Sequence, residues 1–163
     1  MSAPTPSNVP SENLLAGVLR RTHAGAALVG VAIVDQQLED ALLLKMRALN
    51  RELRDRLFTG YGPLSSLSAK IDVAFALQLL DSISYDRVTT ARRIRNLFAH
   101  GDEWLSFESA EIAAMLSKLP AEGANVPNNQ MLYLWHLSQV EAHLISVVGS
   151  SIQKSGAVIR PGA

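Results

Sequence analysis

Hydrophobic residues recur at steps of three and four along most of the chain, which is the spacing of one face of an α-helix. No stretch alternates hydrophobic and polar residues as a strand followed by a hairpin turn does. The longest stripe runs from about residue 24 to about residue 58 and comprises Leu28, Val31, Leu38, Leu42, Met46, Leu49, Leu53 and Leu57. The pattern therefore predicts an all-α protein with one long helix over residues 24–58.

Capping and turn residues divide the rest of the chain into further helices. Ser11 is placed to cap a short first helix that ends near residue 21. The segment Gly60-Tyr61-Gly62-Pro63 predicts a turn, because proline disfavours the helical conformation in the residue before it. Four helices are expected after it: from Ser65 or Ser66 to Leu80, from an Asp86 cap to His100 with a left-handed Gly101, from Ser106 or Ser109 to Leu119, and from Asn129 to Gln153.

The length of 163 residues is that of one domain of ordinary size. We expect a single helical bundle of about five to seven helices over residues 12–153, with flexible tails at 1–11 and 154–163. The first tail contains three prolines and no basic residue, so it lacks the charged start of a secretory signal. The longest apolar run has 11 residues, whereas a membrane span needs about 20, so the expected location is the cytoplasm.

The overall composition removes several classes of function. Fifteen basic and fifteen acidic residues give a formal net charge of zero, which argues against a globally basic nucleic-acid binder. The absence of cysteine excludes disulfides, thiolate metal sites and a cysteine nucleophile. His136 and His143 share one side of the last helix, but no third ligand is near them, so no metal site is expected. No phosphate loop, dinucleotide fingerprint or nucleophile elbow is present, so no cofactor is expected.

The helix predicted to end at Leu80 is apolar on almost every side, which predicts that it lies at the centre of the bundle. Lys70 and Asp72 interrupt this surface. Since an unpaired buried charge costs several kcal/mol, both are expected to be buried and paired, unless they face a water-filled cleft. The candidate partners are carboxylates for Lys70 and arginines for Asp72: Asp35, Glu39, Arg92 and Arg95.

Nine of the fifteen positive charges fall in two short windows. The first window contains Lys45, Arg47, Arg51, Arg54 and Arg56, and the second contains Arg87, Arg92, Arg93 and Arg95. The second window has no acidic residue, so the neutral total conceals local positive potential. Phosphates, nucleic acid or an acidic protein surface could use it. The alternative is a solvated helix face with ion pairs four residues apart.

Two segments together carry a resemblance to a known family. FTGYGPLSSLSAKIDVAFALQLL at 58–80 and IRNLFAH at 94–100 resemble the mannitol operon repressor family of small all-helical bacterial proteins. The similarity extends from about Leu14 to His143 and includes LVGVAIVDQQLEDALL. Gln78 stands where that family commonly has a small residue such as glycine.

The resemblance implies a transcriptional repressor of a sugar-alcohol operon that acts with or through the sugar phosphotransferase system. The histidine phosphocarrier protein of that system is a candidate partner, and a homodimer is compatible with the sequence. No helix-turn-helix is evident. Repression through a protein partner is therefore at least as consistent with the sequence as repression through direct binding of DNA.

A second similarity points to another class. Arg95-Asn96-x-x-x-His100 resembles the signature of HEPN domains, which include metal-independent RNases and inactive binding modules. In an RNase, Arg95 would stabilise phosphate charge and His100 would transfer protons. Residues five apart point about 140° away from each other on a continuous helix, so convergence requires a helix end near Ala99 or a second subunit. We expect no catalysis, and expect Arg95, Asn96 and His100 to stabilise the fold or shape a partner surface.

Overall fold

The computed structural model describes the backbone over residues 12–101 and 105–156, and side chains over 22–101 and 105–150. The described residues form six helices and no strand: α1 (Glu12–Lys45), α2 (Arg51–Phe58), α3 (Leu67–Ala76), α4 (Ser82–His100), α5 (Ala110–Leu116) and α6 (Asn129–Gly156). The all-α prediction is confirmed. The expected cap at Ser11 and the tails at 1–11 and 157–163 lie outside the described residues, while α6 continues past Gln153 into the expected C-terminal tail.

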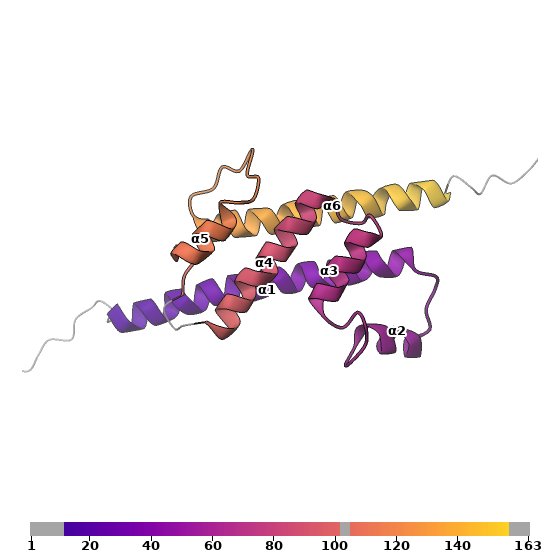
Figure 1. Ribbon diagram of the computed structural model, residues 1–163, viewed down its shortest axis with the longest axis horizontal. Coiled ribbons are helices and arrows are strands. Elements are labelled where there is room, and N and C mark those ends of the chain that lie inside the picture. Colours follow the sequence, from indigo (N-terminus) through magenta and orange to yellow (C-terminus); the bar gives the residue numbers. More distant parts are fainter. Residues whose placement is uncertain (1–11, 102–104, 157–163) are drawn as a thin grey trace, which may run out of the picture.

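The long helices α1 and α6 lie side by side, and α4 crosses both of them diagonally (Figure 1). On the same side, α3 packs between α1 and α4, α5 contacts α4 and α6, and α2 lies near the C-terminal end of α1 (Figure 1). The expectation that the helix at 67–80 is central was wrong. α3 exposes Phe75 and Ala76, and α1 and α4 are the helices with partners on several sides. Among the described residues, no helix has the length and apolar character needed to cross a membrane.

The hydrophobic stripe at 24–58 does not form one helix. α1 is continuous from Glu12 to Lys45, and so joins the two helices that the sequence predicted separately. The helix then breaks at residues 46–50, because Asn50 adopts an extended conformation and its side chain accepts a 2.9 Å hydrogen bond from the Leu53 N–H. This N-cap starts a new helix inside an uninterrupted hydrophobic pattern.

α3 begins as predicted, since Ser66 accepts a 3.2 Å hydrogen bond from the Ala69 N–H. It ends at Ala76 and not near Leu80. Gln78 has a φ of 58°, its N–H donates to the Phe75 carbonyl, and the Leu79 N–H donates to the Ala74 carbonyl at 2.8 Å. This is the hydrogen-bond pattern of a Schellman C-cap, in which the left-handed residue is most often glycine. The small residue expected at this position would fit it without strain.

The ends of α4 also differ from the prediction. Asp81, not Asp86, is the N-cap, and its carboxylate accepts a 2.7 Å hydrogen bond from the Ser84 N–H. Gly101 follows the helix in an extended conformation, with φ −86° and ψ −179°, so the left-handed prediction was wrong. A Cβ at Gly101 would collide with the Leu97 carbonyl oxygen, so this position requires a residue without a side chain. After Ser109, α5 ends at Leu116, one short turn before the predicted end.

Candidate functional site

The buried lysine predicted from the sequence is present and has the predicted partners. Lys70 is 5% exposed, and its Nζ lies 3.0 Å from carboxylate oxygens of both Asp35 and Glu39. Burial disfavours the charged ammonium, but hydrogen bonds and charge from the two carboxylates outweigh it and raise the pKa of Lys70. Arg54 of α2 also donates to Glu39 at 3.1 Å. The charged side chains of this cluster pair with one another, and the pairs join α3 to α1 and α2. This arrangement indicates a structural role.

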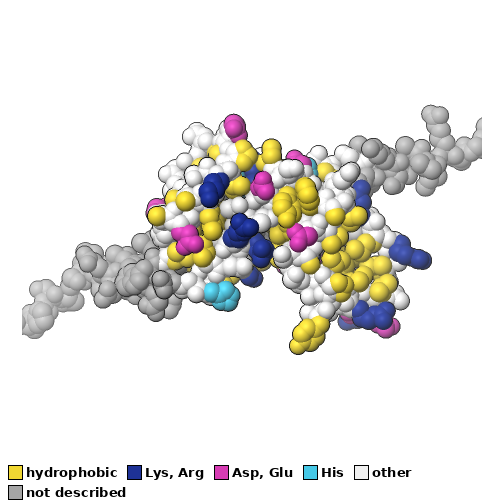
Figure 2. All heavy atoms as spheres, in the orientation of Figure 1, with side chains coloured by type: hydrophobic (Ala, Val, Ile, Leu, Met, Phe, Trp, Pro, Cys, Tyr) yellow, Lys and Arg dark blue, Asp and Glu magenta, His cyan; other side chains and the backbone are white. Residues whose placement is uncertain are grey.

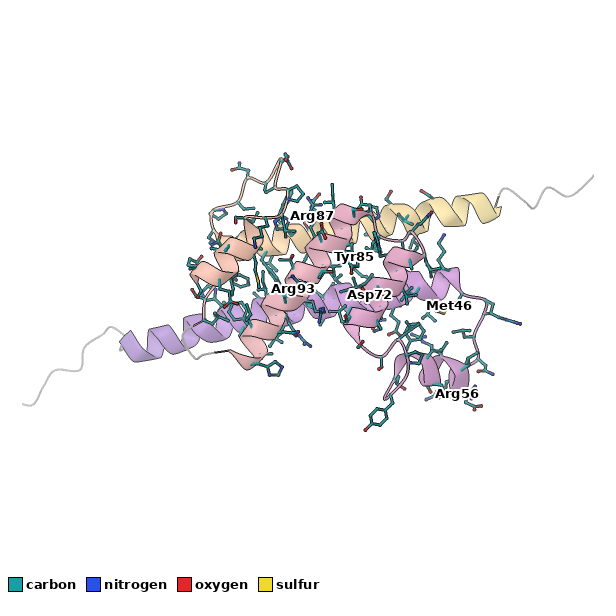
Figure 3. All side chains as sticks on the ribbon, in the orientation of Figure 1. Met46, Arg56, Asp72, Tyr85, Arg87 and Arg93 are labelled. Carbon is teal, nitrogen blue, oxygen red and sulfur yellow. The ribbon has the colours of Figure 1, made fainter. Side chains whose placement is uncertain are left out.

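Asp72 does not behave as predicted. It is exposed, and its carboxylate accepts a 3.0 Å hydrogen bond from the Tyr85 hydroxyl. Neither Arg92 nor Arg95 forms an ion pair with it. The reason is geometric, because residues two apart on a helix point about 160° away from each other and Lys70 faces α1. Asp72 therefore lies on the outer side of α3, where Figure 3 shows it next to Tyr85.

Several arginines of the two basic windows have structural contacts. Arg51 lies 3.8 Å from Asp55, although both side chains are largely exposed and the pair is weak. Arg87 donates to the Pro120 carbonyl at 3.1 Å, and its guanidinium lies 5.2 Å from the centre of the Trp135 ring. The contacts of Arg87 connect α4 to α6 and to the loop that precedes α6. The Arg51–Asp55 pair has the four-residue spacing and the exposure that the solvated-face alternative predicts, whereas Arg87 is used in packing.

Arg92 and Arg93 line an open pocket of about 410 Å³ at the C-terminal half of α4. Its polar side chains are Arg92, Arg93, Asn96 and His100, and Leu97 and Met115 contribute apolar surface. The four polar residues follow one face of the helix at steps of three and four. The opposite face of α4 is occupied by core packing through Val88, Ala91 and Ile94.

Positive charge collects at this pocket. Among the described side chains, neither Arg92 nor Arg93 forms a salt bridge. Figure 2 shows basic side chains in the middle of the face formed by α3 and α4, and Figure 3 places Arg93 on α4 there. The Asn96 side-chain oxygen accepts a 3.0 Å hydrogen bond from Arg95, which leaves the Asn96 amide nitrogen as a donor at the pocket. Two guanidinium groups, an amide and an imidazole can together bind an anionic group.

Arg95 and His100 do not share this pocket. α4 ends at His100, close to the predicted helix end, but both Arg95 and His100 lie within the continuous helix and so point in different directions. Arg95 lies on the side of α4 that faces Tyr133, where burial raises the pKa of the tyrosine and the arginine charge partly offsets it. The sequence predicted His100, Asn96 and Arg92 as candidate site residues, but it assigned Arg92 to Asp72 and named Arg93 only as part of the second basic window. Their helical spacing with Asn96 and His100 is the signal that identifies them.

His136 is a separate buried histidine. It is 1% exposed, and neither ring nitrogen has a hydrogen-bond partner among the described residues. Burial, with a smaller contribution from the positive charge of Arg87, lowers the pKa of His136 to about 4. His143 lies instead 3.7 Å from the Asp81 carboxylate. The described residues contain no group of three or more potential ligands placed to hold a metal ion.

Comparison with models of known families, with curated proteins and with solved structures finds no match to this chain. The resemblances to mannitol operon repressors and to HEPN domains therefore stay predictions. The proposal below rests on the α4 pocket, and on those resemblances for the biological context.

Proposed function

We propose that this protein is a non-catalytic regulator that binds an anionic macromolecule through the pocket on α4. The observation that carries the proposal is the convergence of Arg92, Arg93, Asn96 and His100 on one open pocket. Arginine recognises phosphate and carboxylate groups through paired N–H donors, and an adjacent amide donor adds to this recognition. The charged groups around Lys70 are not available to bind a partner in this way, because they are paired with each other.

The biological context comes from the sequence resemblance, which supports a repressor of a sugar-alcohol operon, such as a mannitol operon. Its partner would be a protein, with the histidine phosphocarrier protein as a candidate, or a nucleic acid. α4 is buried along its core face by α1 and α6 and offers a basic stripe to solvent. Such a stripe contacts phosphates without reading base edges, so we expect duplex DNA binding to be weak and strongly salt-dependent.

A charge-matched pair of variants tests the proposal. Arg92→Ala/Arg93→Ala removes two positive charges from the pocket, and Arg47→Ala/Arg51→Ala removes two from the exposed surface near the start of α2. The purified proteins are compared for binding of the phosphocarrier protein and of operator DNA, with and without nuclease treatment. We expect the pocket variant to lose binding and the control to retain it. Equal losses in both variants would show that net charge alone, and not the pocket, is responsible.

Metal-independent RNA cleavage is the second candidate, because His100 shares the pocket with two arginines. The arginines would stabilise the phosphate in the transition state, and His100 would transfer a proton. Arg95, the arginine of the HEPN-like signature, does not line the pocket. We expect no cleavage of single-stranded RNA in EDTA. Cleavage that disappears in folded His100→Ala and Arg92→Ala/Arg93→Ala variants would overturn the non-catalytic proposal.

A further inference from the structure

Two aromatic side chains meet at the surface where α3 joins α4. The ring centres of Phe75 and Tyr85 are 4.6 Å apart and their planes are inclined by 41°. Phe75 is 41% exposed, so the pair is only partly covered. The hydrogen bond from the Tyr85 hydroxyl to Asp72 restricts the orientation of the tyrosine ring. The result is a preformed aromatic surface in which Tyr85 packs against the hydrophobic core and Phe75 is exposed.

This aromatic pair lies on the same stripe of α4 as the arginine pocket. Tyr85, Arg92, Asn96 and His100 follow each other at steps of seven, four and four residues, which keeps them on one side of the helix. Tyr85 and Arg92 are roughly 10 Å apart along the helix axis, at about 1.5 Å per residue. Figure 3 shows Tyr85 and Arg93 along α4 with Asp72 beside them on α3. In Figure 2, hydrophobic and basic side chains adjoin on this face.

We propose that the aromatic pair and the arginine pocket form one binding track for single-stranded nucleic acid. A base stacks on Phe75 and Tyr85, and neighbouring phosphates bind to Arg92 and Arg93. The inference rests on the proposed function and names the class of partner. Single strands are bound in this way elsewhere, by a positive groove combined with aromatic rings on which bases stack.

Charge complementarity selects this occupant. Among the described residues, the charged side chains that line the pocket are Arg92 and Arg93, which fit a phosphate backbone, whereas the Asp72 carboxylate beside the aromatic rings repels phosphate. A strand therefore lies with its backbone on the arginines and a base against the rings. In a duplex the flat faces of the bases are covered by stacking, so the aromatic pair has nothing to bind. An acidic protein would bind to the arginines without using the rings. The experiment must therefore distinguish an acidic protein from a single strand of nucleic acid.

The test measures fluorescence anisotropy of fluorescein-labelled oligouridylate with the full-length protein in EDTA. Phe75→Leu and Tyr85→Leu each remove one ring, and Tyr61→Leu is the matched control, because Tyr61 is a fully exposed aromatic residue on the turn after α2. We expect each ring variant to bind roughly 5- to 150-fold more weakly, the range for loss of one stacked base. Tyr61→Leu should bind as the wild type does. Circular dichroism establishes that each variant is folded, and Tyr85→Phe, which keeps the ring, should retain most of the binding.

The outcomes separate this inference from the proposed function. Binding that falls in Arg92→Ala/Arg93→Ala but not in Phe75→Leu or Tyr85→Leu would overturn the stacking track and leave the anion-binding function intact. Equal affinity for oligouridylate and for its duplex with oligoadenylate would also overturn the track. If the wild type ignores RNA but binds the phosphocarrier protein through the arginines, the partner is a protein and the inference is wrong. If the protein binds neither of these nor operator DNA, both proposals fail.

Discussion

His136 allows a quantitative prediction about how stability depends on pH. Its ring is 1% exposed on α6, packs 5.1 Å from the Trp135 ring, and has no hydrogen-bond partner for either nitrogen among the described residues. Burial and the charge of Arg87 lower its pKa from 6.5 to about 4. The folded protein therefore keeps this histidine neutral at pH values where the unfolded chain protonates it.

The direction and size of the effect follow from this difference in pKa. As the pH falls below 6.5, the unfolded chain binds a proton that the folded protein does not bind, so the folded state loses stability. The loss continues until the folded protein is also protonated near pH 4. Between pH 7 and pH 5, this single group lowers the free energy of unfolding by about 2 kcal/mol. That is a large fraction of the roughly 5–15 kcal/mol that stabilises a typical domain.

The assay is urea unfolding, followed by circular dichroism, at several pH values from 7 to 5. His136→Leu removes the titrating group and replaces two unpartnered polar atoms with apolar ones, so the variant should be at least as stable as the wild type at pH 7. Its stability should fall by about 2 kcal/mol less than that of the wild type on going to pH 5. His100→Ala, which removes an exposed histidine, is the control. Parallel pH curves for wild type and His136→Leu would refute the reasoning.

Three further predictions concern the fold. Gln78→Gly should raise the free energy of unfolding by about 1 kcal/mol in a denaturant titration, because a left-handed conformation costs a non-glycine residue about 1–2 kcal/mol. Gly30→Ala should lower the melting temperature, because the new Cβ would lie 2.8 Å from the buried Leu137 side chain at the contact of α1 with α6. The overpacking costs about 1–3 kcal/mol and outweighs the roughly 1 kcal/mol that alanine gains over glycine inside a helix, so a raised melting temperature would contradict this. Lys70→Met should cost about 3 kcal/mol by leaving two partly buried carboxylates without their ammonium partner, and a stability equal to the wild type would show that the cluster is not structural.

Local signals in the sequence were sufficient to predict a contact in two cases. One is a residue that caps its own helix, and the other is a buried charge that requires a partner of opposite sign. The Ser66 cap needs only its neighbours three residues away, so it could be predicted. Lys70 could be assigned to Asp35 and Glu39, because a charge on an apolar helix requires a partner and few were in reach. The break at Asn50 could not be predicted from hydrophobic periodicity, since the stripe continues across it and the cap hydrogen bond decides the end of the helix.

The candidate site required the tertiary structure. The basic window at 87–95 was evident in the sequence, but packing of α4 against α1 and α6 decides which arginines reach solvent and which are used for structure. Packing of α3 against α1 through Lys70 places Asp72 on the outside of α3, where it accepts a hydrogen bond from Tyr85 and not from the arginines expected to pair with it. By itself, the sequence determined the all-α class and the cap at Ser66, because helical periodicity and this cap depend on neighbours in the chain, but it did not determine the caps at Asn50 and Asp81. Tertiary structure alone decided which faces remained free, because a helix buries whichever side its partners cover.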